Sequence, residues 1–156
     1  MSESVWDYPR PPRVERSSRH IRIVLGGAVI ADTTDALRVL ETSHPPVYYL
    51  PLDSVADGVL SPSAAQRTFC EWKGMASYLD VSAPGGPTLS AAAWTYPDPS
   101  PPFRDLLGTA AFYPALMDEC TIDGERVQAQ PGDFYGGWIT SEITGPFKGP
   151  PGTLGW

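Results

Sequence analysis

The stretch His20–Ala31, HIRIVLGGAVIA, decides the fold because two apolar runs flank Gly26-Gly27. Glycine readily adopts the positive φ angles of the primed two-residue turns that join antiparallel strands. The pattern therefore predicts a β-hairpin with strands over 20–25 and 28–31. The segment CTIDGERV (120–127) predicts a second hairpin, because Asp-Gly supplies the same kind of turn.

The residues around these hairpins also favour short strands. The chain contains 18 Pro and 15 Gly, which interrupt long helices, yet 42% of its residues are hydrophobic. Asp32–Asp35 can cap a helical turn or precede a strand, and we favour a strand that begins near Ala36. Further expected strands cover 47–50, 68–81 (a pair bent near Gly74), 88–95 and 109–113. Residues 52–67 are expected to form a loop with one helical turn, and 100–108 a short helix.

The two ends of the chain are less regular. Residues 1–16 include VWDYPRPPR (5–13), whose X-Pro steps favour an extended arm. Residues 130–156 are rich in Gly, Pro and aromatic residues, and we expect this irregular tail to pack on the sheets. A chain of 156 residues suits a single domain, 1–156. We expect a mainly β, compact antiparallel domain with one or two short helices.

Charge and hydropathy exclude several function classes. A net charge of −7 argues against nucleic acid and anionic membranes as partners, because both attract clusters of Lys and Arg. No apolar run approaches the roughly 20 residues that span a bilayer. The start MSES (1–4) has neither the basic nor the apolar region of a signal peptide. We therefore expect a cytoplasmic protein without nucleic-acid or membrane partners.

The chain also lacks the usual motifs for metals and nucleotides. It has two Cys and two His, none at metal-ligand spacing, so we expect no metal, no other cofactor and no disulfide framework. No GxxxxGK[ST] or GxGxxG sequence opens a helix, so no phosphate-binding loop is indicated. Lys148 is isolated in the sequence and is expected to be a surface lysine.

The segment TFCEWKGMASY (68–78) contains a thiol, a carboxylate, an indole, an amine and a phenol. Strand alternation would place Glu71 and Lys73 on one face, and Cys70 and Trp72 on the other. The pair is then either a solvated ion pair or a pair of orienting charges inside a pocket. Cys70 as a nucleophile would need a nearby base, and nothing local orients His44 for that role.

A second candidate region is Glu41–Tyr49, ETSHPPVYY, where a carboxylate and His44 meet in a proline-stiffened loop. Loops on a rigid scaffold often carry sites, although Ser43 and His44 can equally satisfy backbone groups at a turn. Aromatic residues recur in the expected strands and in the tail. Most must be core, and a subset can line a cavity.

Six ordered segments carry a family resemblance: RVLETSHPPVYYLP (38–51), TFCEWKGMASY (68–78), AAAWTYPDP (91–99), AAFYP (110–114), IDGERV (122–127) and FYGGWITSEITGPFKG (134–149). This set resembles the bacterial domain-of-unknown-function 427 family over nearly the whole chain. The family is sometimes labelled nucleotidyltransferase, and the motifs do not independently support that label. The family is in turn similar to the β-tent group, which includes methionine sulfoxide reductase B and the ligand-binding domain of cereblon.

The resemblance implies two sheets with a pocket between them. Those relatives carry zinc on two CxxC knuckles, which this chain lacks, so aromatic packing is expected to hold the sheets together. Neither reductase chemistry nor a particular ligand is implied.

We therefore predict a small-molecule-binding domain with an aromatic-lined pocket. The expected ligand-binding residues are Arg38, Glu41, Glu71, Trp72, Lys73, Tyr78, Trp94 and Trp138. One alternative is an enzyme acting on a small metabolite, with Glu71, Lys73 or His44 as acid or base. Another is a protein-interaction module that uses sheet edges or the Pro-rich arm.

Overall fold

Short strands dominate the computed structural model, which describes residues 2–132 and 135–156. The elements are β1 (Glu3–Ser4), η1 (Val5–Asp7), β2 (Arg13–Ser17), β3 (Ile21–Leu25), β4 (Ala28–Thr33), β5 (Ala36–Leu40), β6 (Val47–Pro51), η2 (Leu52–Ser54), β7 (Leu60–Pro62), β8 (Thr68–Cys70), β9 (Gly74–Ser82), β10 (Thr88–Thr95), η3 (Pro101–Leu106), β11 (Thr109–Phe112), η4 (Pro114–Leu116), β12 (Glu119–Ile122), β13 (Glu125–Arg126), β14 (Gln128–Ala129), β15 (Trp138–Ile139) and β16 (Ile143–Thr144). The η elements are 3-10 helices, and the described residues contain no α-helix. The mainly β fold predicted from the sequence is confirmed.

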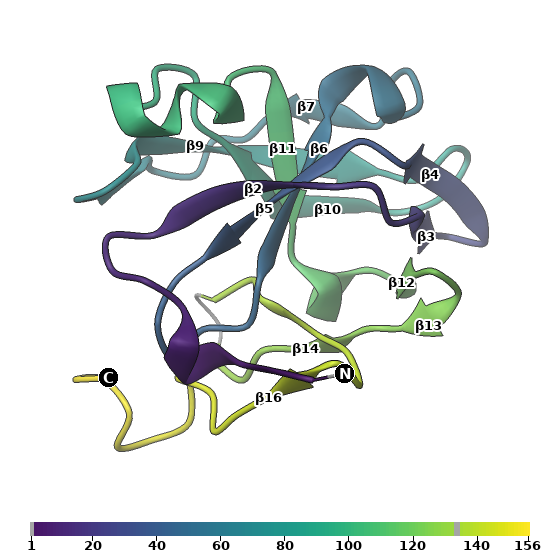
Figure 1. Ribbon diagram of the computed structural model, residues 1–156. Helices are drawn as coiled ribbons and strands as arrows, with labels where there is room; N and C mark the ends of the chain where they lie inside the picture. Colours follow the sequence, from purple (N-terminus) through teal and green to yellow (C-terminus); the bar gives the residue numbers. More distant parts are fainter. Residues whose placement is uncertain (1, 133–134) are drawn as a thin grey trace.

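Two antiparallel sheets make up most of the fold (Figure 1). The large sheet has the strand order β2-β5-β6-β11-β10-β9-β7, with β8 also paired to β9, and the small sheet has the order β13-β12-β3-β4. The predicted hairpins are β3–β4 and β12–β13. Gly26 and Gly27 have φ angles of 62° and 77°, as a primed turn requires.

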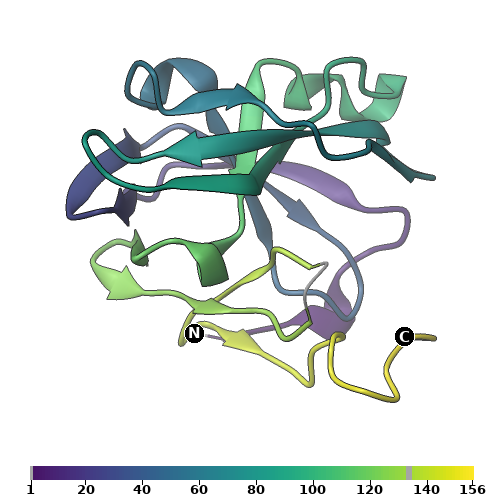
Figure 2. The same ribbon diagram turned by 180° about the vertical axis from the view of Figure 1, so that it is seen from behind.

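The N-terminal segment and the C-terminal tail both lie below the sheets in Figures 1 and 2. β1 pairs with β16 in parallel, and the Trp6 indole donates a hydrogen bond to the Pro146 carbonyl at 2.8 Å. The last residues of the expected arm, from Arg13 on, belong to β2, an edge strand that pairs with β5. Residues 133 and 134 of the tail lie outside the described residues.

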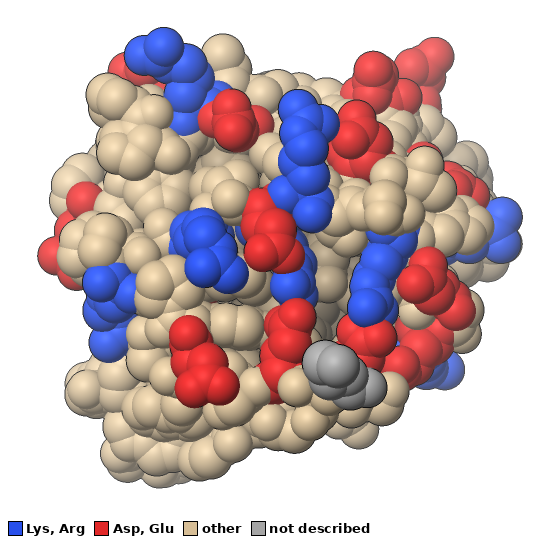
Figure 3. Space-filling view, in the orientation of Figure 1, with Lys and Arg blue, Asp and Glu red and all other residues tan. Residues whose placement is uncertain are grey.

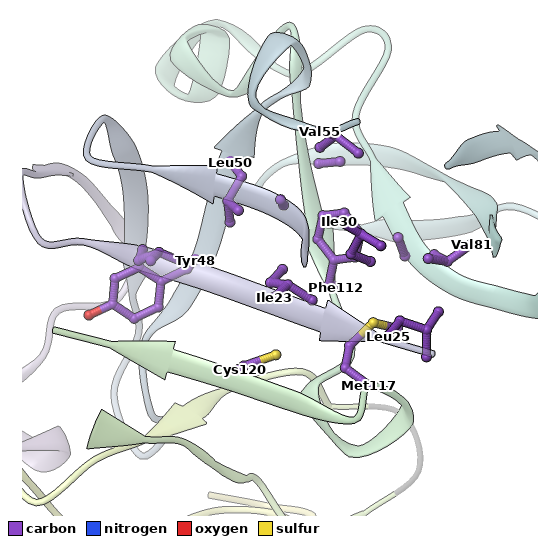
Figure 4. Close-up of a cluster of buried hydrophobic side chains, with 14 of the residues drawn as sticks. Ile23, Leu25, Ile30, Tyr48, Leu50, Val55, Val81, Phe112, Met117 and Cys120 are labelled. Carbon is purple, nitrogen blue, oxygen red and sulfur yellow. The ribbon is translucent and has the colours of Figure 1, made fainter. Parts of the chain in front are cut away.

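An apolar core fills the space between the large and small sheets (Figure 4). Tyr48, Leu50 and Phe112 enter it from the large sheet. Ile23 and Cys120 enter it from the small sheet. Burial raises the pKa of the Cys120 thiol to about 12, and both cysteines of the chain are free. Packing of β-branched and aromatic side chains therefore joins the sheets.

Two local expectations differ from the structure. The helix expected over 100–108 is the 3-10 helix η3, because the Ser100 hydroxyl donates to the Trp72 carbonyl and does not cap the helix. Within the loop expected over 52–67, β7 adds to the edge of β9. Its three residues, Leu-Ser-Pro, are too short a run to show alternation.

Arg38 lies on β5 and holds the N-terminal segment to the large sheet. Its guanidinium donates two hydrogen bonds to Glu3, at 3.0 and 3.1 Å, and one to Glu15 on the neighbouring strand at 2.7 Å. Basic and acidic side chains are interspersed over β2 and β5 on the face seen in Figure 3. Because its hydrogen bonds join Glu3 and Glu15 to β5, Arg38 stabilises the docking of the N-terminal segment.

Replacing Arg38 with methionine is expected to lower the free energy of unfolding by about 1–2 kcal/mol, because a two-pronged charged hydrogen bond is lost. The matched change Arg16→Met removes an ion pair whose side chains are 82% and 74% exposed, and should cost less than about 0.5 kcal/mol. Denaturant unfolding measures both. Equal losses would show that Arg38 does not clamp the arm.

Candidate functional site

A cavity of about 600 Å³ lies on the face of the large sheet that is turned away from the small sheet. Side chains alternate along β6, so Tyr48 and Leu50 point into the core between the sheets, while Val47 and Tyr49 line the cavity. The prediction of a pocket between two sheets is corrected here, because that space is filled by apolar side chains.

Four aromatic side chains, on β6 and β10 and directly after β10 and β11, form the floor of the cavity: Tyr49, Trp94, Tyr96 and Tyr113. The rings of Trp94 and Tyr113 are 4.6 Å apart at their centroids, and the Trp94 indole donates a hydrogen bond to the Tyr49 hydroxyl at 3.3 Å. Tyr49 also packs edge-on against Trp94 at 6.2 Å. These contacts hold the floor in one arrangement without a ligand.

The residues Glu71, Trp72 and Lys73 form a turn between β8 and β9. This corrects the predicted strand, because alternation stops at Cys70. The loop that precedes η3 fixes the turn, since the backbone N–H of Ser100 donates to the Lys73 carbonyl at 3.0 Å. Glu71 is exposed at the cavity margin while Lys73 points inward, and among the described residues no ion pair joins them.

Lys73 is the most buried charged residue at the cavity, with 9% of its surface exposed. Its ammonium lies 5.9 Å from the centre of the Tyr96 ring, and Cys70 is among its polar neighbours. Burial alone would lower the pKa of Lys73. Its polar neighbours, chiefly Tyr49 and Cys70, raise this pKa, and the net direction is upward. Lys73 therefore keeps its charge at neutral pH.

A second polar group on the cavity wall is centred on His44. Its Nδ1 accepts a hydrogen bond from the Gln130 side-chain amide at 3.4 Å, and its Nε2 lies 3.6 Å from a Glu41 carboxylate oxygen. Gln130 is itself fixed, because its amide also donates to the Lys148 carbonyl at 2.7 Å. The ring contacts Tyr135 edge-on at 5.4 Å. His44 thus has a defined orientation, with its Nε2 proton toward Glu41.

His44 is neutral at pH 7. Burial has the largest effect and lowers its pKa, and three cations lower it further, to about 4: Lys148, Arg10 and Lys73. A base with so low a pKa accepts protons poorly at neutral pH, and Lys73 with a raised pKa donates them poorly. The lowered pKa of His44 and the raised pKa of Lys73 therefore both favour ligand binding over acid–base chemistry.

The depressed pKa of His44 predicts a loss of stability in acid. Between the unfolded value, near 6.5, and the folded value, about 4, the unfolded chain binds a proton that the folded protein does not. The free energy of unfolding should therefore fall as the pH falls through this window, by about 3 kcal/mol at most. His44→Gln should remove this part of the pH dependence. Denaturant curves from pH 7 to pH 4 measure it, and parallel curves for the two proteins would contradict the burial of a neutral imidazole.

The structure brings most of the predicted site residues to one cavity and leaves two elsewhere. The cavity is lined by Glu41, His44, Glu71, Trp72, Lys73, Tyr78 and Trp94. Arg38 is outside it, held by Glu3 and Glu15. Trp138 is fully buried in the core between the sheets, where it packs against Tyr48 at 5.2 Å. Both are therefore removed from the candidate site.

Sequence reasoning missed several cavity residues, above all Lys148. It was expected at the surface, but it is half-buried, lines the cavity and lies 5.8 Å from the centre of the Tyr135 ring. A signal was present, because Trp72-Lys73-Gly74 and Phe147-Lys148-Gly149 share an aromatic-Lys-Gly pattern. Gln130 and Tyr49 had no comparable signal.

Comparison with known families places the chain. A family model, described as domain of unknown function DUF427, matches residues 13–123. The chain belongs to the DUF427 family. The DUF427 match includes the cavity floor and the turn that carries Lys73, but not Gln130 or Lys148 in the tail. A comparison with curated proteins finds none that matches.

Two searches of the structure define its other features. Among residues 2–132 and 135–156, no group of three or more His, Cys, Asp or Glu side chains is arranged to hold a metal ion. Over the same residues, no helix has the length and apolar character needed to cross a membrane.

Proposed function

We propose that this DUF427 protein binds a small organic molecule in the cavity on the outer face of its large sheet. The supporting observation is the cavity itself, whose volume of about 600 Å³ falls within the range of about 300–1,000 Å³ typical of ligand sites. Its walls combine aromatic rings with a few polar groups, and such a combination gives a ligand both affinity and orientation.

The cavity walls are organised before any ligand arrives. The Thr68 and Tyr78 hydroxyls are hydrogen-bonded at 3.0 Å, which ties β8 across to β9 beside the cavity. Trp94 is held by Tyr49 and Tyr113, as described above. A preformed wall loses little conformational entropy on binding, so the proposed site needs no folding step.

A small-metabolite enzyme is the second candidate, and it is favoured by the convergence of His44, Lys73 and Cys70 on one cavity. Its weakness is the protonation state of the first two groups at neutral pH, which suits binding and orientation. A reaction that uses these groups would require a bound substrate to change their pKa values.

A panel of planar metabolites tests the binding function, with thermal unfolding and tryptophan fluorescence as readouts. A ligand present at 100 times its Kd should stabilise the protein by about 2.7 kcal/mol. It should also change the emission, because Trp72 and Trp94 line the cavity. A panel that leaves both the unfolding temperature and the emission unchanged would contradict the proposal.

A further inference from the structure

Both lysines of the chain line the same cavity. Lys73 and Lys148 are the only lysines in the sequence, and the protein as a whole carries a net charge of −7. Each ammonium lies over the ring of a tyrosine. The Lys73 ammonium is 5.9 Å from the centre of the Tyr96 ring, and the Lys148 ammonium is 5.8 Å from the centre of the Tyr135 ring. The two ammonium groups would attract an anionic ligand to the cavity, although the protein as a whole is acidic.

Lys73 is a buried cation whose ammonium has no carboxylate in direct contact among the described residues, and Glu41 acts on it only from a longer distance. No ion pair within 4.0 Å involves it in that part of the chain. Glu41, the more buried of the two glutamates at the cavity, faces Arg10 and His44 at 3.6 Å each, and Glu71 is exposed. Burying a charge without a partner is costly, so an anion supplied by a ligand would lower the free energy of the site.

A second cation, Lys148, acts on the same cavity as Lys73. The pKa of His44 is lowered by burial and then by three cations, two of which are the cavity lysines. Lys73 and Lys148 thus both act on the ring of His44, whose Nε2 lies 3.6 Å from Glu41. The imidazole is neutral and adds no charge of its own, but it can orient a polar group of a ligand.

The rest of the cavity fits a flat apolar body. Trp94 and Tyr113 lie on one side, and Trp72 and Tyr78 line the cavity as well. Aromatic side chains of this kind pack well against planar rings. We infer that the ligand is an aromatic carboxylate, a planar apolar molecule whose carboxylate binds the ammonium of Lys73. This inference rests on the proposed function and names its ligand class.

A carboxylate fits better than a phosphate. Phosphates are typically bound by several donors at once, from arginine forks, glycine-rich loops, helix N-termini or lysines. Among the described residues that line the cavity there is no arginine, and the nearby helical elements are short 3-10 turns. Of the two cavity lysines only Lys73 is buried, and its ammonium beside the aromatic rings matches one negative charge.

Isothermal titration with matched probe pairs tests the inference. The pairs are naphthoate with naphthamide, and indoleacetate with indoleacetamide, which differ in charge and hardly in shape, and adenosine monophosphate is a third arm. The wild-type protein should bind each carboxylate about ten-fold or more tightly than its amide. Lys73→Met should remove that preference. The control Arg104→Met, which removes one positive charge from an exposed residue of η3, should keep it.

The outcomes separate this inference from the proposed function. If amides bind as well as or better than carboxylates in the wild-type protein, the cavity is a binding site and the inference is overturned. Tighter binding of adenosine monophosphate than of either carboxylate also overturns it. If no probe of either charge binds, the proposed function fails together with the inference. The wild-type comparison stands even if Lys73→Met does not fold.

Discussion

Replacing Trp138 with alanine is expected to lower the free energy of unfolding by about 3–5 kcal/mol. The side chain is fully buried between the sheets, packs against Tyr48, and its indole N–H donates to the Phe112 carbonyl at 3.4 Å. Alanine would leave a large void, and the surrounding strands can close it only in part. Chemical denaturation measures the loss, and the slope of the transition checks that unfolding stays two-state.

Trp6→Ala is the matched control. Trp6 is 42% exposed and contacts the tail through Trp156 and the Pro146 carbonyl. Trp6→Ala should lower the free energy of unfolding by about 1 kcal/mol, because little buried apolar area is lost. Similar losses of unfolding free energy for the two variants would contradict the placement of Trp138 in the core. If Trp138→Ala folds but binds ligand much more weakly than the wild type, Trp138 belongs to the binding site after all.

Gly136→Ala is expected to weaken ligand binding by about ten-fold or more. A Cβ atom at this position would lie 2.2 Å from Cη2 and 2.9 Å from Cζ3 of Trp94, so the ring or the tail segment must move. Because Trp94 forms the floor of the cavity, either movement changes the space that a ligand occupies. Overpacking of this kind also costs about 1–3 kcal/mol of stability. Titration with naphthoate and denaturant unfolding measure the two effects.

Gly155→Ala is the control for the extra methyl group. No atom lies within 4 Å of its added Cβ, so stability and affinity should stay at the wild-type level. The prediction for Gly136 is wrong if Gly136→Ala binds naphthoate with wild-type affinity and its Trp94 indole N–H signal has the same position as in the wild type.

Local turn chemistry explains why much of the fold could be predicted. Gly26-Gly27 and Asp123-Gly124 adopt positive φ angles that few other residues tolerate, so the sequence states where those hairpins turn. The strand that begins at Ala36 follows from a short apolar run. These signals lie within a few residues of the structure that they determine.

The turn at Glu71–Lys73 could not be predicted in this way. Its polar and apolar residues continue the alternation of β8, so the local pattern favours a strand. What bends the chain is distant: the Ser100 backbone and hydroxyl bind the carbonyls of Lys73 and Trp72. Gly74, with a φ of 109°, accommodates the bend.

The candidate site depends on pairings between distant residues. The cavity that Tyr49 of β6 helps to form is also lined by Gln130 and Lys148, which come from the distant tail. Arg38 was expected at the site because charged groups and aromatic rings converge in the family-like segments. Its partners Glu3 and Glu15 come from the N-terminal segment instead, and no sequence spacing reveals that contact.

The account is tested most directly by the indole N–H signals of the five tryptophans in an NMR titration with naphthoate. Trp72 and Trp94 line the cavity, whereas Trp138 lies in the core and Trp6 packs against Trp156 near the chain ends. Single Trp→Phe variants assign the five signals. The account predicts that the signals of Trp72 and Trp94 shift and saturate while the other three stay in place. Shifts confined to Trp6 and Trp156, or no saturable shift at all, would contradict a binding site in the cavity.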